Sequence, residues 1–161
     1  MIQEKVQFLK HKLVILLRQV PSDTAPQWGK MTLQQMVEHF SDSVRIASGK
    51  TRYTEIVTPE HHLEKMRSFL VSDKPFRENT MNPLMPEVPA PVRNRSAEEA
   101  INELKSELAN FFSSFEKAPI QVTRNPIFGD LNFEENVQLL YKHALHHLRQ
   151  FGITIEKETQ V

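Results

Sequence analysis

Residues 125–152 read NPIFGDLNFEENVQLLYKHALHHLRQFG, and this stretch decides the fold. Asn132, followed three residues later by Glu135, forms the pattern of a helix N-cap with a capping box. Apolar residues then recur at three- and four-residue steps, as on one face of a helix. Gly152 fits a C-terminal stop. The stretch therefore predicts one amphipathic helix from Asn132 to Gly152.

Two histidines, His143 and His147, lie one turn apart on this predicted helix. At about 100° per residue both fall on the edge of the apolar face, whereas His146 is expected to point to water. Side chains at i and i+4 project side by side and can bind one metal ion, although such a pair is more often two partly exposed histidines. Ala144 follows His143, so the HExxH motif of zinc proteases is absent.

The composition favours a single domain, residues 1–161, that is large enough for a real core. The 20 basic and 20 acidic side chains balance, which argues against a nucleic-acid-binding surface. The chain has no cysteine, so any metal must bind histidine or carboxylate ligands, and a cytoplasmic location is expected. The apolar runs are too short to span a membrane, and the N-terminus does not resemble a signal peptide.

Three further amphipathic helices are predicted from the same periodicity. The first runs from Gln3 to Val20 and is stopped by Pro21. The second begins at Thr32 with a capping box and ends at Gly49. The third opens with a capping box at Ser96 and ends before Pro119.

The link between the second and third helices, residues 50–95, is long. A short helix from Thr58 to Leu70 is predicted within it, with His61 and His62 exposed. The proline-rich segment that follows, from Asn79 to Ser96, should be extended and is long enough to cover part of a pocket.

Three shorter segments carry weaker signals. Trp28 is expected to plug the end of the helical assembly, and a second interpretation makes it the wall of a pocket. Residues Gln121 to Thr123 are expected to form a brief extended piece. The tail from Ile153 to Val161 alternates weakly and is expected to be a strand or a loose end.

Four helices with one apolar face each are buried most simply in an all-α four-helix bundle. The short link between the first two helices makes them antiparallel. The long link can return along the whole bundle, which allows the second and third helices to be parallel. The predicted topology is therefore up-down-down-up, with a long crossover between the second and third helices.

This topology places the start of the second helix and the end of the fourth at one end of the bundle. At 1.5 Å per residue, His39 lies about 10 Å from the start of the second helix, and His147 and His143 lie about 6 and 12 Å from the end of the fourth. The three side chains should therefore form a metal site with an open position, which is the catalytic pattern. Further groups expected around the pocket are Ser43, Asn136 and Gln150.

Two separated motifs resemble the DinB-like (YfiT-like) superfamily, in a branch of unknown function. They consist of Trp28-Gly29-Lys30-Met31 with Gln34 to His39, and of Asn125-Pro126, Phe128-Gly129 and Tyr141 to Gly152. The resemblance implies an up-down-down-up bundle, often a homodimer, in which His39, His143 and His147 hold a divalent metal. Some relatives are metal-dependent transferases or isomerases that use a low-molecular-weight thiol. Asn136 stands where that branch usually has tryptophan, so the shape of the pocket is not carried over.

Three functional hypotheses follow. The first is a metal-dependent enzyme, with Zn or Ni and a small-molecule substrate or thiol, such as a thiol-dependent transferase; a hydrolase is less favoured because no general base is evident. The alternative is a non-catalytic small-ligand-binding or stress-response module with the same fold. The third is an assembly protein that dimerises through an apolar outer helix face, which the sequence does not clearly show.

Overall fold

The computed structural model describes residues 2–79 and 85–155. This part of the chain is mostly helical and contains one small two-stranded sheet. In chain order, the elements are α1 (Ile2–Gln7), the π-helical segment η1 (Phe8–Lys12), α2 (Leu13–Gln19), α3 (Leu33–Ser48), α4 (Glu60–Val71), α5 (Ala97–Lys117), β1 (Thr123–Asn125), β2 (Gly129–Leu131) and α6 (Phe133–Gln150).

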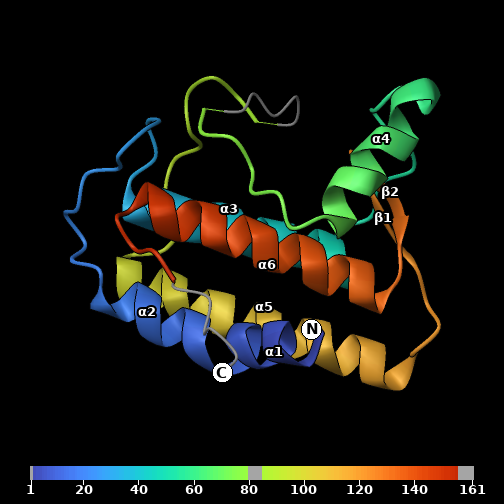
Figure 1. Cartoon of the computed structure of the whole chain (residues 1–161). Helices are drawn as coiled ribbons and strands as arrows, with labels where there is room; N and C mark the ends of the chain where they lie inside the picture. The colour runs from blue at the N-terminus through green and yellow to red at the C-terminus, as the bar shows by residue number, and fades with distance from the viewer. Residues whose placement is uncertain (1, 80–84, 156–161) are drawn as a thin grey trace, which may run out of the picture.

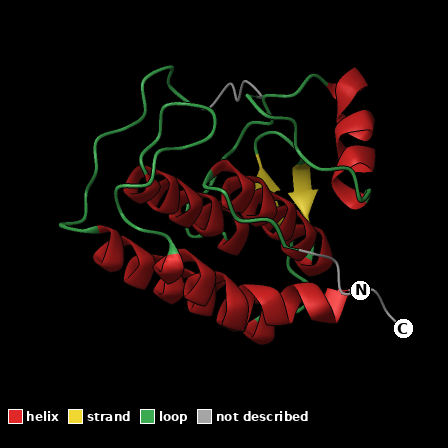
Figure 2. Cartoon of the chain, turned by 60° about the vertical axis from the view of Figure 1, so that its left-hand side comes forward, coloured by secondary structure: helices red, strands yellow, loops and turns green. Residues whose placement is uncertain are grey.

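Four long helical units lie side by side (Figures 1 and 2), and the first of them is the continuous run of α1, η1 and α2. The colour gradient of Figure 1 shows that this unit and α6 run in one direction, whereas α3 and α5 run in the opposite direction. The described parts of the link between α4 and α5, residues 72–79 and 85–96, lie on the outside of the helices, and the second part leads to the start of α5. The chain directions are those expected from the lengths of the links.

Helices α3 and α6 begin with the predicted capping boxes. The Thr32 side chain accepts a hydrogen bond from the backbone N–H of Gln35, and the Gln35 side chain accepts one from the backbone N–H of Thr32. Asn132 and Glu135 form the same pair at the start of α6. Each box satisfies two backbone donors that a helix start would otherwise leave unpaired.

The end of α6 is equally well defined. Gly152 has a φ of +86°, a left-handed conformation that glycine adopts without steric cost. The N–H of Gly152 donates to the Arg149 carbonyl, and the N–H of Ile153 donates to the Leu148 carbonyl. This is a Schellman motif, and it fixes the last turn of the helix that carries the histidines.

The predicted first helix forms over the expected length, but it contains a π-helical segment that was not predicted. The N–H of Leu13 donates to the Phe8 carbonyl, five residues back. The wider turn allows Phe8, Leu9 and Leu13 all to be buried in the core.

The main core lies between the four helical units and consists of aliphatic and phenylalanine side chains. A second, smaller core lies on the outer side of α6, where α4 and the hairpin pack against it. Its buried members are Leu70, Phe128, Leu131 and Leu139. Helix α6 is therefore buried on two sides, whereas its sequence pattern predicted one apolar face.

The all-α prediction is wrong in one respect, because residues 123–131 form an antiparallel hairpin. Thr123 pairs with Leu131, and Asn125 pairs with Gly129. The Asn125 side chain accepts hydrogen bonds from the N–H groups of Ile127 and Phe128, which closes the turn. The predicted extended piece, Gln121 to Thr123, overlaps the hairpin only at Thr123, because three-residue strands show almost no periodicity.

The described chain ends shortly after α6. Residues 153–155 form no regular element, and the rest of the predicted tail lies outside the described residues. In the part of the chain that the structure describes, no helix combines the length and the apolar character needed to cross a bilayer.

Candidate metal centre

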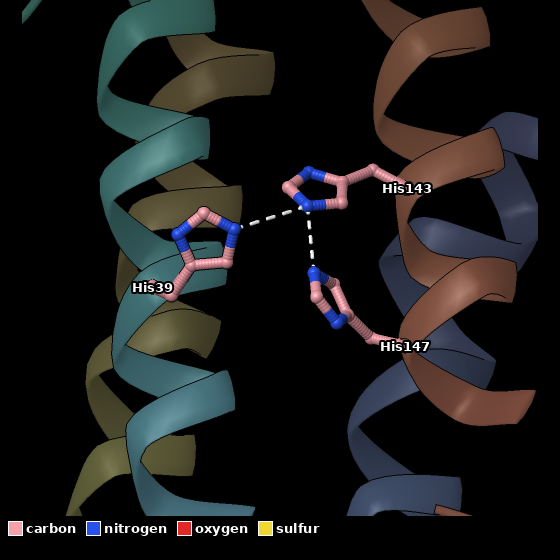
Figure 3. A group of neighbouring side chains, drawn as sticks. All are labelled: His39, His143 and His147. Carbon is pink, nitrogen blue, oxygen red and sulfur yellow. Dashed lines mark hydrogen bonds between the residues drawn. The ribbon is translucent and has the colours of Figure 1, made fainter. Parts of the chain in front are cut away.

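The three predicted histidines lie together between α3 and α6 (Figure 3). His39 projects from α3, and His143 and His147 project from successive turns of α6. The Nε2 atoms of His39 and His143 are 3.2 Å apart, and those of His143 and His147 are 2.7 Å apart. The ring centre of His39 lies 5.1 Å from that of His143 and 5.3 Å from that of His147. His39 therefore converges on one point with two histidines that lie about a hundred residues further along the chain.

The spacing of these nitrogens suits one ion. Two nitrogens that each lie 2.0–2.1 Å from a tetrahedral ion are about 3.4 Å apart. The possible ligand atoms of the three histidines all lie within 4.8 Å of one another. Among the described residues, these are the side chains that form a group of three or more able to share an ion.

The hydrogen on His147 is placed by Gln150. The Nδ1 atom of His147 lies 2.8 Å from Gln150 Oε1, and Gln150 Nε2 donates to the Trp28 carbonyl at 3.1 Å. Because a carbonyl only accepts, the Trp28 contact fixes the orientation of the Gln150 amide. The amide oxygen then accepts from Nδ1–H of His147. The lone pair of His147 is therefore on Nε2 and faces the other histidines, as in outer-sphere support of a metal ligand.

Burial makes the three rings neutral. It lowers the pKa of His39, with partial opposition from the Asp42 carboxylate. It also lowers the pKa of His143 and His147 well below the usual value, and the neighbouring histidines add to this effect. Neutral imidazole is the form that binds metals.

Hydrogen bonds between the three rings cannot satisfy all three facing nitrogens. With His147 Nε2 a lone pair, His143 Nε2 carries at most one hydrogen, and that hydrogen points well at only one of its two neighbours. A cation between the rings would use the lone pairs of all three nitrogens. The donor set of three neutral imidazoles suits Zn, Ni, Cu or Fe, and not the oxygen-preferring Mg or Ca.

The loop before α3 docks onto the same glutamine. The N–H of Gln27 donates to the Gln150 carbonyl at 2.7 Å. Gly29 has a φ of +78°, and a Cβ at this position would lie 3.0 Å from Gln150 Nε2. Glycine is required for this close approach. The tryptophan-glycine pair of the sequence motif therefore connects the loop to the histidine group.

Aromatic rings surround the outer side of the group. The Trp28 ring lies 5.4 Å from the ring of His146, which is half-buried. The Phe76 ring lies 5.9 Å from His146 and 6.3 Å from His143. The prediction that His146 points to water is wrong, because two loops cover this side of α6. The Trp28 ring therefore packs against α6 beside the histidine group.

Of the three predicted neighbours of the site, Gln150 alone contacts a histidine ring through a hydrogen bond in the described residues. Ser43 Oγ donates to the backbone carbonyl of His39 at 3.3 Å, within its own helix. Asn136 donates to Thr123 Oγ1 and to the Leu131 carbonyl, so it supports the hairpin and its predicted role at the pocket is wrong. The sequence placed Asn136 on the correct edge of the helix but could not show that the hairpin packs against it there.

Glu38, the residue before His39 on α3, is buried under the crossover, with 4% of its surface exposed. Its carboxylate accepts from the backbone N–H of Arg93 at 2.7 Å and from that of Asn94 at 3.1 Å. Burial raises the pKa of Glu38, but these bonds, together with bonds from the side chains of Gln34 and Asn94, outweigh burial and lower it. The sequence did not reveal this role because its partners lie far along the chain.

No family model, curated protein or solved structure matches the chain. The resemblance to DinB-like proteins therefore depends on the two sequence motifs. The site depends on the geometry described above.

Proposed function

We propose that this protein is a metal-dependent enzyme of the DinB-like superfamily, with an up-down-down-up four-helix bundle. In this proposal His39, His143 and His147 hold one divalent ion, Zn or Ni, and the protein is a cytoplasmic homodimer. The observation that carries the proposal is the convergence of three neutral imidazoles whose nitrogens lie within 4.8 Å of one another. Three protein ligands leave a position free for substrate, as in catalytic zinc sites.

A bound ion would lower the pKa of a thiol or water molecule and would thereby supply the nucleophile. The protein side chains orient and shield the site. Gln150 holds the ring of His147, and Trp28 and Phe76 reduce access of water from the outer side. A thiolate needs no further base once its proton has left, so the most concrete activity is thiol-dependent group transfer to a small molecule.

The acidic side chains near His39 are already engaged, and this favours the thiol reaction over hydrolysis. Glu38 accepts hydrogen bonds from the backbone of the crossover. Asp42 accepts from Arg45 at 2.8 Å. Neither carboxylate is therefore free to act as a general base on a bound water molecule, the role that glutamate has in HExxH metalloproteases.

Metal content measured by mass spectrometry after metal-replete expression tests the site. We expect about one Zn or Ni per chain in the wild type and none in His143→Ala. His61→Ala, which changes an exposed histidine on α4, should retain the ion. Equal metal content in the wild type and His143→Ala would contradict the ligand assignment. Absence of metal from all three proteins would favour the small-ligand-binding module.

Activity is tested separately with the metal-loaded protein. Transfer of a low-molecular-weight thiol to a small electrophile would be followed for several thiols, in the wild type and in His143→Ala. Loss of the reaction in the variant is expected. A metal-loaded wild type that transfers no thiol would remove the proposed reaction and leave the metal site intact.

A further inference from the structure

A pocket of about 200 Å³ lies beside His39. Helix α3 forms one wall, and the crossover segment 85–93 forms the other. Its lining includes Met31, Gln35, His39, Met85, Pro89 and Ala90. His39 is a member of both the pocket and the three-histidine group. A molecule in this pocket would therefore contact one of the three proposed ligands.

Side chains of α3 hold the crossover wall in place. Gln35 Nε2 donates to the Ala90 carbonyl at 3.0 Å, while the oxygen of the same amide accepts from the N–H of Thr32. Glu38 accepts from the N–H of Arg93 at 2.7 Å. The crossover segment is thus attached to α3 at Ala90, near the middle of the segment, and at Arg93, at its end. Preorganised walls of this kind reduce the entropy cost of binding.

Proline suits such a wall. Pro86, Pro89 and Pro91 have no N–H group, so the extended segment can border an apolar ligand without exposing unpaired donors to it. The thioether side chains of Met31 and Met85 add polarisable, adaptable surface.

The charged groups of the lining are already compensated. Asp42 Oδ2 accepts from Arg93 at 3.3 Å, and Arg93 also pairs with Glu103. The Glu38 carboxylate is occupied by backbone donors of the crossover. A charged ligand would lose its hydration without gaining a free partner, and an uncharged one would not.

The volume limits the size of the ligand. An apolar cavity of about 150 Å³ binds one benzene molecule. The pocket beside His39, about 200 Å³, therefore has room for one six-membered ring with a short substituent.

We propose that this pocket binds a compact, uncharged, apolar group of the substrate, about the size of a benzyl group. A donor atom attached to that group reaches the three-histidine centre past the ring of His39. The position of the donor atom rests on the proposed metal site, whereas binding of the apolar group concerns the pocket alone. Two separate measurements are therefore needed.

The first measurement tests ligand binding to the pocket in the metal-free protein. Methionine methyl groups labelled with ¹³C would be followed by NMR while benzyl alcohol is added. The methyl signals of Met31 and Met85 should shift, and that of Met66, which packs in the second core, should not. Ala90→Phe should abolish the shifts because the larger side chain occupies the pocket. Ala118→Phe, at an exposed position after α5, is the matched control.

The second measurement tests whether a thiol that occupies the pocket also binds the metal. The Co²⁺-loaded protein would be titrated with phenylmethanethiol, 2-mercaptoethanol and mercaptoacetate, which share one thiol head group. The cobalt absorption spectrum gives each affinity. Phenylmethanethiol should bind at least about tenfold more tightly than the other two, since it alone carries a buried apolar ring. Ala90→Phe should bring this ratio close to one without changing the cobalt content.

The outcomes distinguish the two ideas. Equal affinities for the three thiols, or tightest binding of mercaptoacetate, would overturn the pocket proposal. So would an unchanged ratio in both Ala90→Phe and Met31→Ala, where the second variant removes part of the apolar wall. Shifts of the Met31 and Met85 signals in a protein that binds no cobalt would support the pocket and overturn the metal site.

Discussion

Two polar clusters, each with one member on helix α3, differ in how completely their groups are paired. The acid–arginine cluster, formed by Glu38, Arg93 and Glu103, lies under the crossover, and the three-histidine group lies towards α6. In the first, the two oxygens of Glu38 accept from backbone N–H groups, and Glu103 accepts from Arg45 and Arg93. In the second, three nitrogens face one another with at most one hydrogen well placed between them. The first cluster is complete, and the second has room for a cation.

The two clusters meet at adjacent residues, Glu38 and His39. Burial is therefore not what separates a structural polar group from a binding one. The difference is whether the lone pairs have donors within the protein. Removal of a side chain from the acid–arginine cluster should reduce stability, whereas removal of a histidine should reduce metal affinity.

The largest expected effect is on metal binding in His39→Ala. This histidine is the ligand from the opposite helix, so the variant tests the convergence itself. Loss of an outer-sphere partner typically weakens metal binding 10–100-fold, and loss of a direct ligand should exceed about 100-fold. Competition with a chromogenic chelator would measure the dissociation constant. Ser43→Ala, on the same helix and without a bond to the ring, should differ from the wild type by less than about threefold.

The next effect is on stability, in Glu38→Ala. This change leaves two backbone N–H groups of the crossover without their acceptor, which should cost about 2–3 kcal/mol of unfolding free energy. Urea denaturation of the metal-free protein would measure it. The control is Glu98→Ala, because the exposed pair between Glu98 and Arg18 should contribute less than about 1 kcal/mol. Equal losses in the two variants would mean that the buried carboxylate does not hold the crossover.

A smaller effect on metal affinity is expected for Gln150→Leu. The variant removes the acceptor for His147 Nδ1–H and the donor to the Trp28 carbonyl. Binding should weaken about 10–100-fold because the tautomer and orientation of His147 are no longer fixed. Gln138→Leu is a matched change on the other side of α6, where the amide donates to the Ser72 carbonyl. That control should lower stability and leave metal affinity unchanged; the opposite pattern would exclude Gln150 from the site.

The ends of α3 and α6 and the meeting of their histidines could be predicted from the sequence. The capping boxes at Thr32 and Asn132 and the periodic apolar faces predicted the ends and the orientation of α3 and α6. The link lengths allowed the chain directions that the structure has. Since each histidine could be placed by its distance from a helix end, the convergence of His39 with His143 and His147 was predictable.

Contacts between distant segments could not be predicted in the same way. Asn136 and His146 were misplaced because their neighbours come from the hairpin and from two loops. The burial of Glu38 was not predicted because its partners come from the crossover. None of these segments has a helical period that would give its position. Gln150 was identified as a neighbour of the site because it lies on the same helix as its partner.

The smallest effect in this comparison is the pH dependence carried by Glu103. Burial raises the pKa of this carboxyl, but hydrogen bonds from Arg93, Asn94 and Arg45 outweigh burial and lower it from 4.5 to about 2. Because the pKa is lower in the folded protein, this stabilisation is present above about pH 4.5 and is lost as the pH falls towards about 2. Its size should be on the order of 1 kcal/mol, since the side chain is partly exposed and screened.

Urea denaturation of the metal-free wild type and of Glu103→Gln, from pH 6 to pH 2, would measure this contribution, and the difference between the two cancels the other titrating groups. The stability of the wild type should fall more steeply than that of the variant below about pH 4.5, so that the two curves approach each other. Parallel curves would mean that Glu103 is not held ionised by the arginines. The acid–arginine cluster would then resemble the histidine group, in which the fold leaves polar groups incompletely paired.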